Sequence, residues 1–234
     1  MIKTTMDKIE TIAFDADDTL WINENYFQEA EKQFCELLDT YLPAYQVSAL
    51  LLKTEIKNLP LYGYGVKGFV LCMIETSHAI TGPYTDKNIV SRIIEIGHSL
   101  LQQPVVLLDG VLETLKALQG RYNLIVATKG DLLDQQRKLR NSSLEEYFSH
   151  VEIMSDKTTN DYRKLLTQQK CLPQHFLMLG NSLKSDVLPV LELGGFAAHI
   201  PYEITWAHEE HTEINNKHNF LKINKIENIL NHLL

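Results

Sequence analysis

The sequence predicts an α/β fold in which a parallel β-sheet flanked by helices carries an inserted α-helical domain. Short apolar strand patterns and helical patterns alternate in the second half of the chain, which is typical of a parallel sheet with right-handed crossovers. Between the first strand pattern and this region, residues 24–103 show only helical periodicity. We therefore expect a sheet domain over residues 1–21 and 105–234, and a helical domain over residues 22–104.

The strand patterns of the sheet domain lie in residues 9–16, 122–127, 151–154, 175–179 and 196–200. Helical patterns follow them, beginning near Gly110, Asp131, Thr158 and Leu183. Residues 224–234 have the apolar spacing of a closing helix, with Asn224 and Glu227 at the positions of a capping box. The sheet domain is thus expected to begin with a strand and end with a helix.

The helical domain contains one strong amphipathic pattern and one strong break. The pattern is formed by Phe27, Ala30, Phe34, Leu37, Leu38 and Tyr41. Residues 59–68, LPLYGYGVKG, contain three glycines and a proline, so we expect a shaped loop there rather than a continuous helix. Pro83 and Pro104 are expected to break the helical pattern again.

The composition is that of a folded chain, with 44% hydrophobic and 22% charged residues among 234. A formal net charge of -8 without a long Lys/Arg run opposes binding to nucleic acid, whereas a small phosphorylated metabolite remains possible as a partner. The sequence shows no signal segment and no apolar run of membrane-spanning length, which predicts a cytoplasmic protein without a membrane partner. The three cysteines, Cys35, Cys72 and Cys171, lack CxxC spacing, so we expect reduced thiols. The oligomeric state stays open.

Three carboxylates crowd the end of the first strand pattern. Residues 14–20 read FDADDTL and contain Asp15, Asp17 and Asp18. Like charges this close are unfavourable unless a cation or a reaction uses them. Ligands of open α/β sheets bind at the carboxyl ends of the strands. The segment therefore predicts a metal-bound nucleophile site.

With three further segments, this pattern resembles the haloacid dehalogenase-like (HAD) superfamily. Residues 15–19 fit its first motif, DxDxT, and the later segments follow in its order: Thr128 ending LIVAT, Lys157 in SDKT, and residues 180–186, GNSLKSD. The resemblance extends over residues 9–200. It implies a Rossmann-like core, an inserted helical cap domain, and Mg²⁺-dependent phosphatase activity on a small phosphomonoester.

Asp15 and Asp17 are the candidate catalytic carboxylates. An ionised Asp15 can attack phosphorus and form an acyl phosphate that water later cleaves. The resemblance assigns to Asp17 the protonation of the leaving oxygen and the activation of that water. Either aspartate taken alone could instead serve in a turn or a helix cap. Asp18 is expected to help turn the chain and Thr19 to hydrogen-bond around Asp15.

The predicted cofactor is Mg²⁺, which prefers an octahedron of oxygen ligands. The carboxylate of Asp15, the backbone carbonyl of Asp17 and the carboxylate of Asp186 form a suitable set. Asn181 stands where the superfamily usually has an acidic residue, and its amide oxygen could face the metal. The alternative for Asn181 is a loop or helix-start role.

Three more residues are candidates for holding the phosphoryl group. Thr128 offers a hydroxyl. Lys129 stands at the start of a predicted helix, and the free backbone N–H groups of that helix start can hold phosphoryl oxygens. Lys157 is expected to place its charge beside Asp15. Thr128 could instead be a β-branched strand residue, and Lys157 a solvated surface lysine. Two other lysines compete for its place, Lys164 and Lys184.

Two segments outside these motifs contain candidate site residues. Residues 62–69 resemble the specificity loop of a cap domain, with Tyr62, Tyr64 and Lys67 as substrate contacts, although the aromatic rings could instead pack inward. A second metal site is suggested by Trp206, His208, Glu209, Glu210 and His211. No third ligand or His-x-x-x-His pair is defined there, so we expect a loop that packs against the core.

Three other functions compete with the phosphatase. A phosphomutase would use the same nucleophile and require a bisphosphate primer. A dehalogenase has no use for the proton donor Asp17. A binding module could keep the fold and lose turnover, which Asn181 would favour, whereas keeping both Asp15 and Asp17 argues against it.

Overall fold

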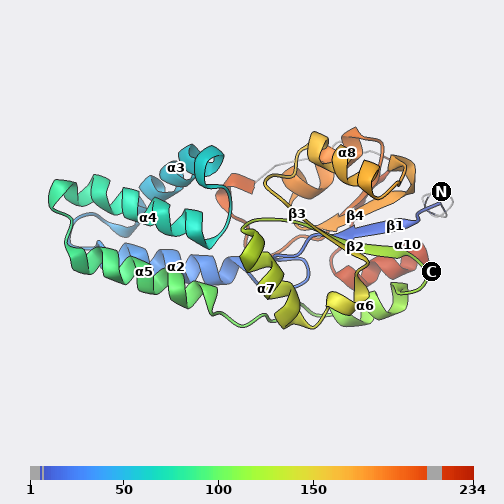
Figure 1. Ribbon diagram of the computed structural model, residues 1–234, viewed down its shortest axis with the longest axis horizontal. Coiled ribbons are helices and arrows are strands. Elements are labelled where there is room, and N and C mark those ends of the chain that lie inside the picture. The colour runs from blue at the N-terminus through green and yellow to red at the C-terminus, as the bar shows by residue number, and fades with distance from the viewer. Residues whose placement is uncertain (1–5, 7, 210–217) are drawn as a thin grey trace. The chain divides into compact units, whose positions relative to one another are not determined.

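The computed structural model describes Met6, residues 8–209 and residues 218–234, and the chain divides into two units (Figure 1). The first, here called the sheet unit, comprises Met1–Ile22, Val105–Lys129 and Gln135–Leu234. The second, here called the helical unit, comprises Asn23–Pro104 and Gly130–Asp134. The segment Gly130–Asp134 thus groups with the helical unit, although the sequence division placed it in the sheet domain.

A six-stranded parallel sheet forms the centre of the sheet unit, which confirms the predicted fold class. Its strands are β1 (Thr11–Phe14), β2 (Asn123–Lys129), β3 (His150–Met154), β4 (Phe176–Gly180), β5 (Phe196–His199) and β6 (Phe220–Lys222). Their order is β3-β2-β1-β4-β5-β6, and every neighbouring pair is parallel. In register, Phe14 of β1 lies between Val126 of β2 and Leu179 of β4. The carboxyl ends of these three strands therefore meet at one edge of the sheet.

Helices cover both faces of this sheet. They are α6 (Val111–Leu118), α7 (Leu132–Ser142), α8 (Thr159–Gln168), α9 (Leu188–Glu192) and α10 (Leu230–Leu233). Figure 1 shows α8 on one side of the strands, with α6 and α10 on the other. Side chains of β1 alternate accordingly: Ile12 and Phe14 share a core with Leu115 of α6, and Ala13 shares one with Tyr162 of α8. The near-continuous apolar composition of β1 reflects burial on both faces.

Single-turn helices complete the sheet unit. They are Glu145–Tyr147, Pro173–His175, the π-helical Leu183–Val187, Ala207–Glu209 and Ile226–Ile229. The helix starts predicted near Gly110, Asp131 and Thr158 agree with the observed starts to within one residue, and the one near Leu183 begins as the π-helical turn. No helix in the described parts of the chain has the length and apolarity that crossing a membrane would demand.

The C-terminal prediction was wrong in detail. The closing segment is a 3₁₀ turn, Ile226–Ile229, that continues into the short helix α10. Its start is capped by Asn228 Oδ1, which accepts the backbone N–H of Lys225 at 3.1 Å, one residue beyond the predicted pair Asn224 and Glu227. Glu227 instead packs against Gly110, where a Cβ would lie 2.3 Å from Glu227 Oε2. The sequence also missed β6, which is only three residues long.

The helical unit is built from α2 (Glu24–Leu37), α3 (Ala44–Tyr62), α4 (Val66–Thr81), the 3₁₀ turn Gly82–Tyr84 and α5 (Lys87–Leu101). Its core includes Phe34, Leu51, Met73 and Ile93, all fully buried. The predicted break at residues 59–68 is much shorter than expected. Pro60 lies within the last turn of α3, and only residues 63–65 separate α3 from α4. Gly63 and Gly65 adopt φ values of 68° and 105°, which L-residues rarely adopt, and this is where the helix ends.

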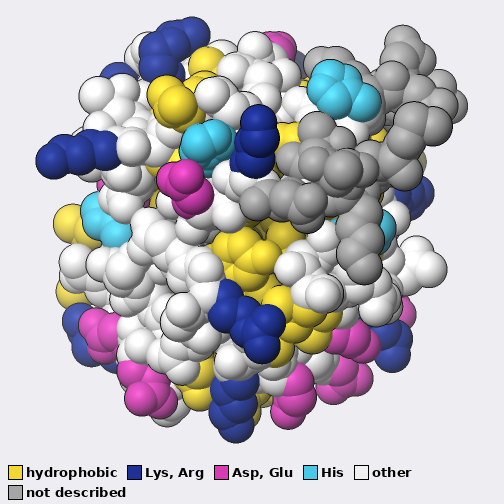
Figure 2. All heavy atoms as spheres, turned by 90° about the vertical axis from the view of Figure 1, so that its right-hand side faces the viewer, with side chains coloured by type: hydrophobic (Ala, Val, Ile, Leu, Met, Phe, Trp, Pro, Cys, Tyr) yellow, Lys and Arg dark blue, Asp and Glu magenta, His cyan; other side chains and the backbone are white. Residues whose placement is uncertain are grey.

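Surface charge is mixed on the face shown in Figure 2. Dark-blue Lys and Arg side chains are interspersed there with magenta Asp and Glu side chains among the described residues.

Candidate active site

Asp15 lies at the carboxyl end of β1, directly after the buried Phe14. Its backbone N–H still donates to the carbonyl oxygen of Leu179 in β4 at 2.9 Å, so the backbone is fixed where the side chain leaves the sheet. The carboxylate is almost fully buried and accepts a short hydrogen bond from Lys157 Nζ. Lys157 Nζ also donates to Asp186 Oδ1 at 2.6 Å. One ammonium group therefore bridges two buried carboxylates.

Lys157 is held at this position by the local structure that follows β3. The next residue, Thr158, is the N-cap of α8 and forms a capping box with Asp161. The Lys157 side chain is 1% exposed, so the alternative of a solvated surface lysine is wrong. The competing lysines lie elsewhere: Lys164 pairs with Asp161, and Lys184 donates to the backbone carbonyl of His208.

Burial and neighbouring charges set the ionisation of this cluster. Desolvation raises the pKa of Asp15, the positive charge of Lys157 opposes that shift, and the negative charge of Asp186 adds to it, so that the pKa rises from 3.8 to about 7. The pKa of Lys157 is raised well above its usual value because the attraction of Asp15 and Asp186 outweighs desolvation. Lys157 therefore stays protonated while Asp15 titrates near neutral pH.

The chain turns sharply after Asp15, as the sequence predicted. Asp18 adopts a left-handed φ of 61°, and its N–H donates to the carbonyl oxygen of Trp21 at 2.8 Å. Thr19 Oγ1 lies 3.2 Å from Asp15 Oδ2 and 3.4 Å from Asn181 Oδ1, so its hydroxyl can donate to either. The turn places Thr19 against the carboxylate that it was expected to support.

Asp17 points toward a different set of partners. Its carboxylate accepts from Trp21 Nε1 at 2.7 Å and from Gln135 Nε2 at 2.7 Å. Lys138 Nζ lies 3.0 and 3.2 Å from its two oxygens. These partners were missed by sequence reasoning, although Gln135 and Lys138 are three residues apart on α7 and so lie on one helix face. Acid/base catalysis by Asp17 requires it to give up at least one of these bonds, and catalytic hydrogen bonds often form fully only in the substrate complex.

Thr128 and Lys129 are the last two residues of β2, which is longer than predicted. Thr128 is buried, and its hydroxyl contacts the carbonyl oxygen of Lys129 at 3.5 Å, the limit of a hydrogen bond. Lys129 Nζ donates to Ser185 Oγ at 2.9 Å and to the Glu209 carboxylate. Lys129 is thus neutralised by a carboxylate of the protein itself.

The fourth motif forms a tight turn after β4. Asp186 lies in the π-helical turn Leu183–Val187, and its Oδ2 accepts the N–H of Ser182 at 3.0 Å. A Cβ at Gly180 would lie 2.2 Å from Asp186 Oδ2, so only glycine leaves room for this carboxylate. The hydroxyl of Thr19 lies within hydrogen-bond distance of both Asn181 Oδ1 and Asp15 Oδ2. The backbone carbonyl oxygen of Asn181 lies 2.9 Å from Nε2 of His199.

The oxygen donors at this edge suit a hard cation. The group contains the carboxylates of Asp15 and Asp186 and the amide oxygen of Asn181, with neither sulfur nor imidazole among them. Gly180 leaves the space that Asp186 needs. Within the described residues no three His, Cys, Asp or Glu side chains are grouped closely enough to hold a metal. The side chain of Asp17 is bound to Lys138 instead of joining Asp15 and Asp186. The donor set therefore fits Mg²⁺ with two carboxylates, which leaves positions for neutral oxygen ligands.

The candidate substrate residues of the helical unit lie around the break between α3 and α4. Tyr62 ends α3, and its hydroxyl donates to Glu75, so the alternative of an inward-packed ring does not hold for Tyr62. Tyr64 lies between the two helices. Lys67 is in the first turn of α4 rather than in a loop, and its Nζ donates to Asp131 Oδ2 at 2.9 Å.

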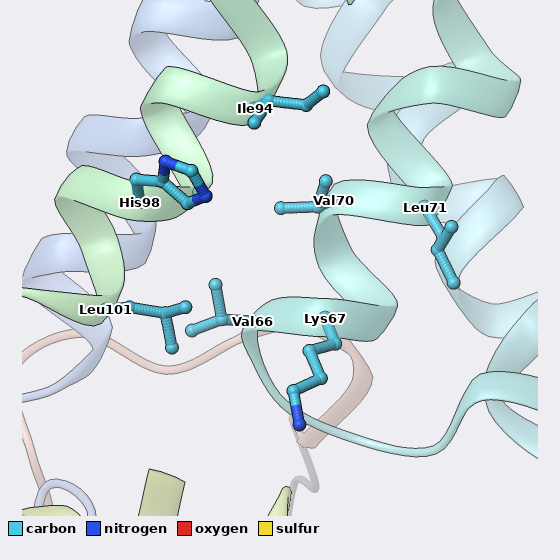
Figure 3. Close-up of a pocket in the computed structure, with 8 residues that line it drawn as sticks. Val66, Lys67, Val70, Leu71, Ile94, His98 and Leu101 are labelled. Atoms are coloured by element: carbon cyan, nitrogen blue, oxygen red, sulfur yellow. The ribbon is translucent and has the colours of Figure 1, made fainter.

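Lys67 also borders a mainly apolar pocket between α4 and α5 (Figure 3). In the close-up, Val66, Val70, Ile94, His98 and Leu101 face the space between the two helices, whereas the Lys67 ammonium extends away from them. The volume of this pocket is about 320 Å³.

The second metal site that the sequence suggested, and that we did not expect, does not form among the described residues of its segment. Glu209 accepts from Lys129, Ser182 and Ser185, and the ring of Trp206 lies 5.0 Å from that of His208. Two of the candidates, Glu210 and His211, lie outside the described residues. In the described part, Glu209 contacts the rest of the sheet unit through these hydrogen bonds, whereas the side chains of residues 201–208 are exposed or half-buried. The sequence offered no signal that Glu209 would pair with Lys129, because 80 positions separate them.

Comparison with known proteins identifies the family and several relatives of this chain. The sequence model of the haloacid dehalogenase-like hydrolases matches residues 9–194. The glyceraldehyde 3-phosphate phosphatase of Methanothermobacter thermautotrophicus is 25% identical over 215 residues, which are 88% of this chain and 92% of that protein. A haloacid dehalogenase-like family hydrolase from Xanthomonas campestris has a TM-score of 0.82 at 36% identity, over 93% of this chain and 87% of its own.

A third similarity concerns the fold alone. The magnesium-bound structure of YfnB from Bacillus subtilis has a TM-score of 0.64 at 18% identity, over 96% of this chain and 98% of its own. The family match, by contrast, extends over most of the sheet unit and the whole segment between the first and second motifs. The chain belongs to the haloacid dehalogenase-like hydrolase family.

Proposed function

We propose that this hydrolase is a Mg²⁺-dependent phosphatase that cleaves a small phosphomonoester through an aspartyl phosphate on Asp15. The observation that carries the proposal is the buried cluster in which Lys157 bridges Asp15 and Asp186. A buried carboxylate whose pKa is raised to about 7, beside a lysine held protonated, is suited to nucleophilic attack on an anionic ester near neutral pH. The phosphatase similarity described above supports the same reaction class.

The reaction would proceed in two displacements. An Asp15 carboxylate oxygen attacks phosphorus, and the ester P–O bond breaks as Asp17 gives a proton to the leaving oxygen. Water then attacks the phosphorus of the aspartyl phosphate, Asp17 takes its proton, and the bond to Asp15 breaks to release phosphate. Lys157 and the hydroxyl of Thr128 would hold phosphoryl oxygens in both steps. Turnover therefore restores every group of the protein.

The residues that would hold the cation are Asp15, Asp186, the backbone carbonyl of Asp17 and the amide oxygen of Asn181. When bound, Mg²⁺ supplies positive charge that reduces the repulsion between these carboxylates and the substrate phosphate. A magnesium-bound relative of this fold supports that choice of metal.

We further propose that the helical unit is a cap domain whose residues select the substrate. Tyr62, Tyr64 and Lys67 lie around the glycine-flanked break between α3 and α4, which was the sequence basis for this role. In the free protein, Lys67 is paired with Asp131. Binding of an anionic substrate by Lys67 would therefore compete with that exposed pair.

Hydrolysis of an aryl phosphate, measured with and without Mg²⁺, tests the catalytic proposal. Asp15→Asn should lower kcat by at least about 1000-fold, because an amide is a poor nucleophile of nearly the same shape. Asp109→Asn, at an exposed position of the sheet unit, removes the same charge and serves as the matched control. Full activity of Asp15→Asn would refute the mechanism. Activity that needs a bisphosphate primer would point to a phosphomutase, and halide release to a dehalogenase.

A further inference from the structure

Glu209 is a mostly buried carboxylate of the sheet unit that accepts hydrogen bonds from three side chains. It follows β5 in the 3₁₀ turn Ala207–Glu209, and its side chain is 11% exposed. One oxygen accepts from Lys129 Nζ, and the other accepts from Ser182 Oγ and, at 2.7 Å, from Ser185 Oγ. Burial raises the pKa of Glu209, but the charge of Lys129 and the three hydrogen bonds outweigh it and lower the pKa to about 2. Glu209 is therefore ionised at any working pH.

The two serines connect Glu209 to the turn that contains Asp186. Ser182 Oγ accepts the N–H of Ser185 at 3.0 Å, which caps the start of the π-helical turn. The N–H of Ser182 donates to Asp186 Oδ2 at 3.0 Å, and the N–H of Asp186 donates to the carbonyl of Ser182 at 2.9 Å. Through Ser182, Glu209 is therefore linked to both the side chain and the backbone of Asp186.

Strand order gives this network its position. Lys129 ends β2 and Ser185 follows β4, and β1 lies between those strands. Neighbouring strands are about 4.8 Å apart, so the hydrogen bond from Lys129 to Ser185 joins segments that follow two strands about 10 Å apart, on either side of β1. Glu209 accepts from both ends of this contact and ties them together.

We propose that Glu209 is a positioning residue that fixes Asp186 for Mg²⁺ binding, an inference that rests on the proposed function. The π-helical turn is an uncommon conformation, and Glu209 accepts hydrogen bonds from the serine at its N-cap, Ser182, and from one within it, Ser185. Partners of metal-binding carboxylates orient those carboxylates and thereby contribute to metal affinity. The tie to Lys129 holds the turn in register with β2, so that Asp186 stays within reach of Lys157 and Asp15.

Only an ionised carboxylate meets the demands of this position. Lys129 can only donate, and a carboxylate offers enough lone pairs to accept from all three partners. In Glu209→Gln, the amide can keep one oxygen toward Lys129, but it then presents an N–H₂ group to the serines. Glu209→Gln should accordingly retain part of the support, and Glu209→Ala should retain none.

The test is Mg²⁺ binding to the substrate-free protein by isothermal titration calorimetry. Glu209→Ala should raise the Kd for Mg²⁺ by about tenfold, and Glu209→Gln should raise it less. Glu203→Gln removes an exposed carboxylate from the same connection and should leave the Kd unchanged. Thermal unfolding without Mg²⁺ identifies the variants that fold. Ser185→Ala is a second, milder variant that removes only the hydrogen bond from Ser185 to Glu209 and the one from Lys129 to Ser185. Its Kd should rise as well.

Three results would overturn the proposal. An unchanged Kd in folded Glu209→Ala would show that Asp186 is fixed without Glu209. A lower Kd for inorganic phosphate in that variant, with Mg²⁺ binding unaltered, would show that Glu209 instead blocks an anion site at Lys129. If the wild-type protein binds Mg²⁺ and hydrolyses an aryl phosphate in either case, the proposed function stands and only the role of Glu209 fails. If the wild-type protein binds no Mg²⁺, both fail together.

Discussion

Replacing Asp15 with Asn should stabilise the metal-free protein, and the gain should grow with pH. The pKa of Asp15 rises from 3.8 to about 7 in the folded protein because the carboxylate is buried beside Asp186. Between these two values the folded state binds more protons than the unfolded state, so the free energy of unfolding falls as the pH rises. A shift of this size corresponds to about 4 kcal/mol in total, of which about 3 kcal/mol falls between pH 5 and pH 8. Asn has no such dependence.

Urea unfolding at constant ionic strength, with EDTA present, measures this difference. Both tryptophans, Trp21 and Trp206, belong to the sheet unit, so their fluorescence reports on the unit that contains Asp15. The free energy of unfolding of Asp15→Asn minus that of the wild type should increase by about 3 kcal/mol from pH 5 to pH 8. Asp109→Asn, an exposed control, should show no such trend. A difference that is constant across this range would refute the claim that the folded protein penalises an ionised Asp15.

Three further substitutions test the metal ligands and the helical unit. Gly180→Ala places a Cβ 2.2 Å from Asp186 Oδ2 and should raise the Kd for Mg²⁺ at least about tenfold by calorimetry; an unchanged Kd would contradict the assigned role of Asp186. Asn181→Asp adds a negative ligand and should lower the half-saturating Mg²⁺ concentration by a few-fold, whereas no change would place Asn181 outside the coordination shell. Lys67→Ala breaks an exposed ion pair with Asp131, so stability should change by less than about 1 kcal/mol while the ranking of phosphate esters by kcat/KM changes; constant ratios would refute a role in selection.

The sequence alone determined the order of the strands β1 to β5 and the helices between them, and the strand ends at which polar residues collect. Buried parallel strands need apolar residues on both faces, so β1 to β5 could be located from their apolar runs, and their alternation with helices implied the parallel sheet. The crowding of Asp15 and Asp17 after β1 was equally visible. The short strand β6 and the Asn228 cap were missed because three strand residues and a one-residue shift leave almost no periodic signal.

Only the tertiary structure decided which side chains meet at the carboxyl edge of the sheet. The order β3-β2-β1-β4 brings Lys157, Asp15 and Asp186 together from positions up to 171 residues apart, and burial gives Asp15 its raised pKa. The same packing turns the carboxylate of Asp17 toward Lys138 and pairs Lys129 with Glu209. Local sequence patterns define which face of an element is apolar, but they contain no information on the partners of a polar side chain across the sheet. Those partners depend on strand order and on the loops that cross it, and they set the charge balance of the site.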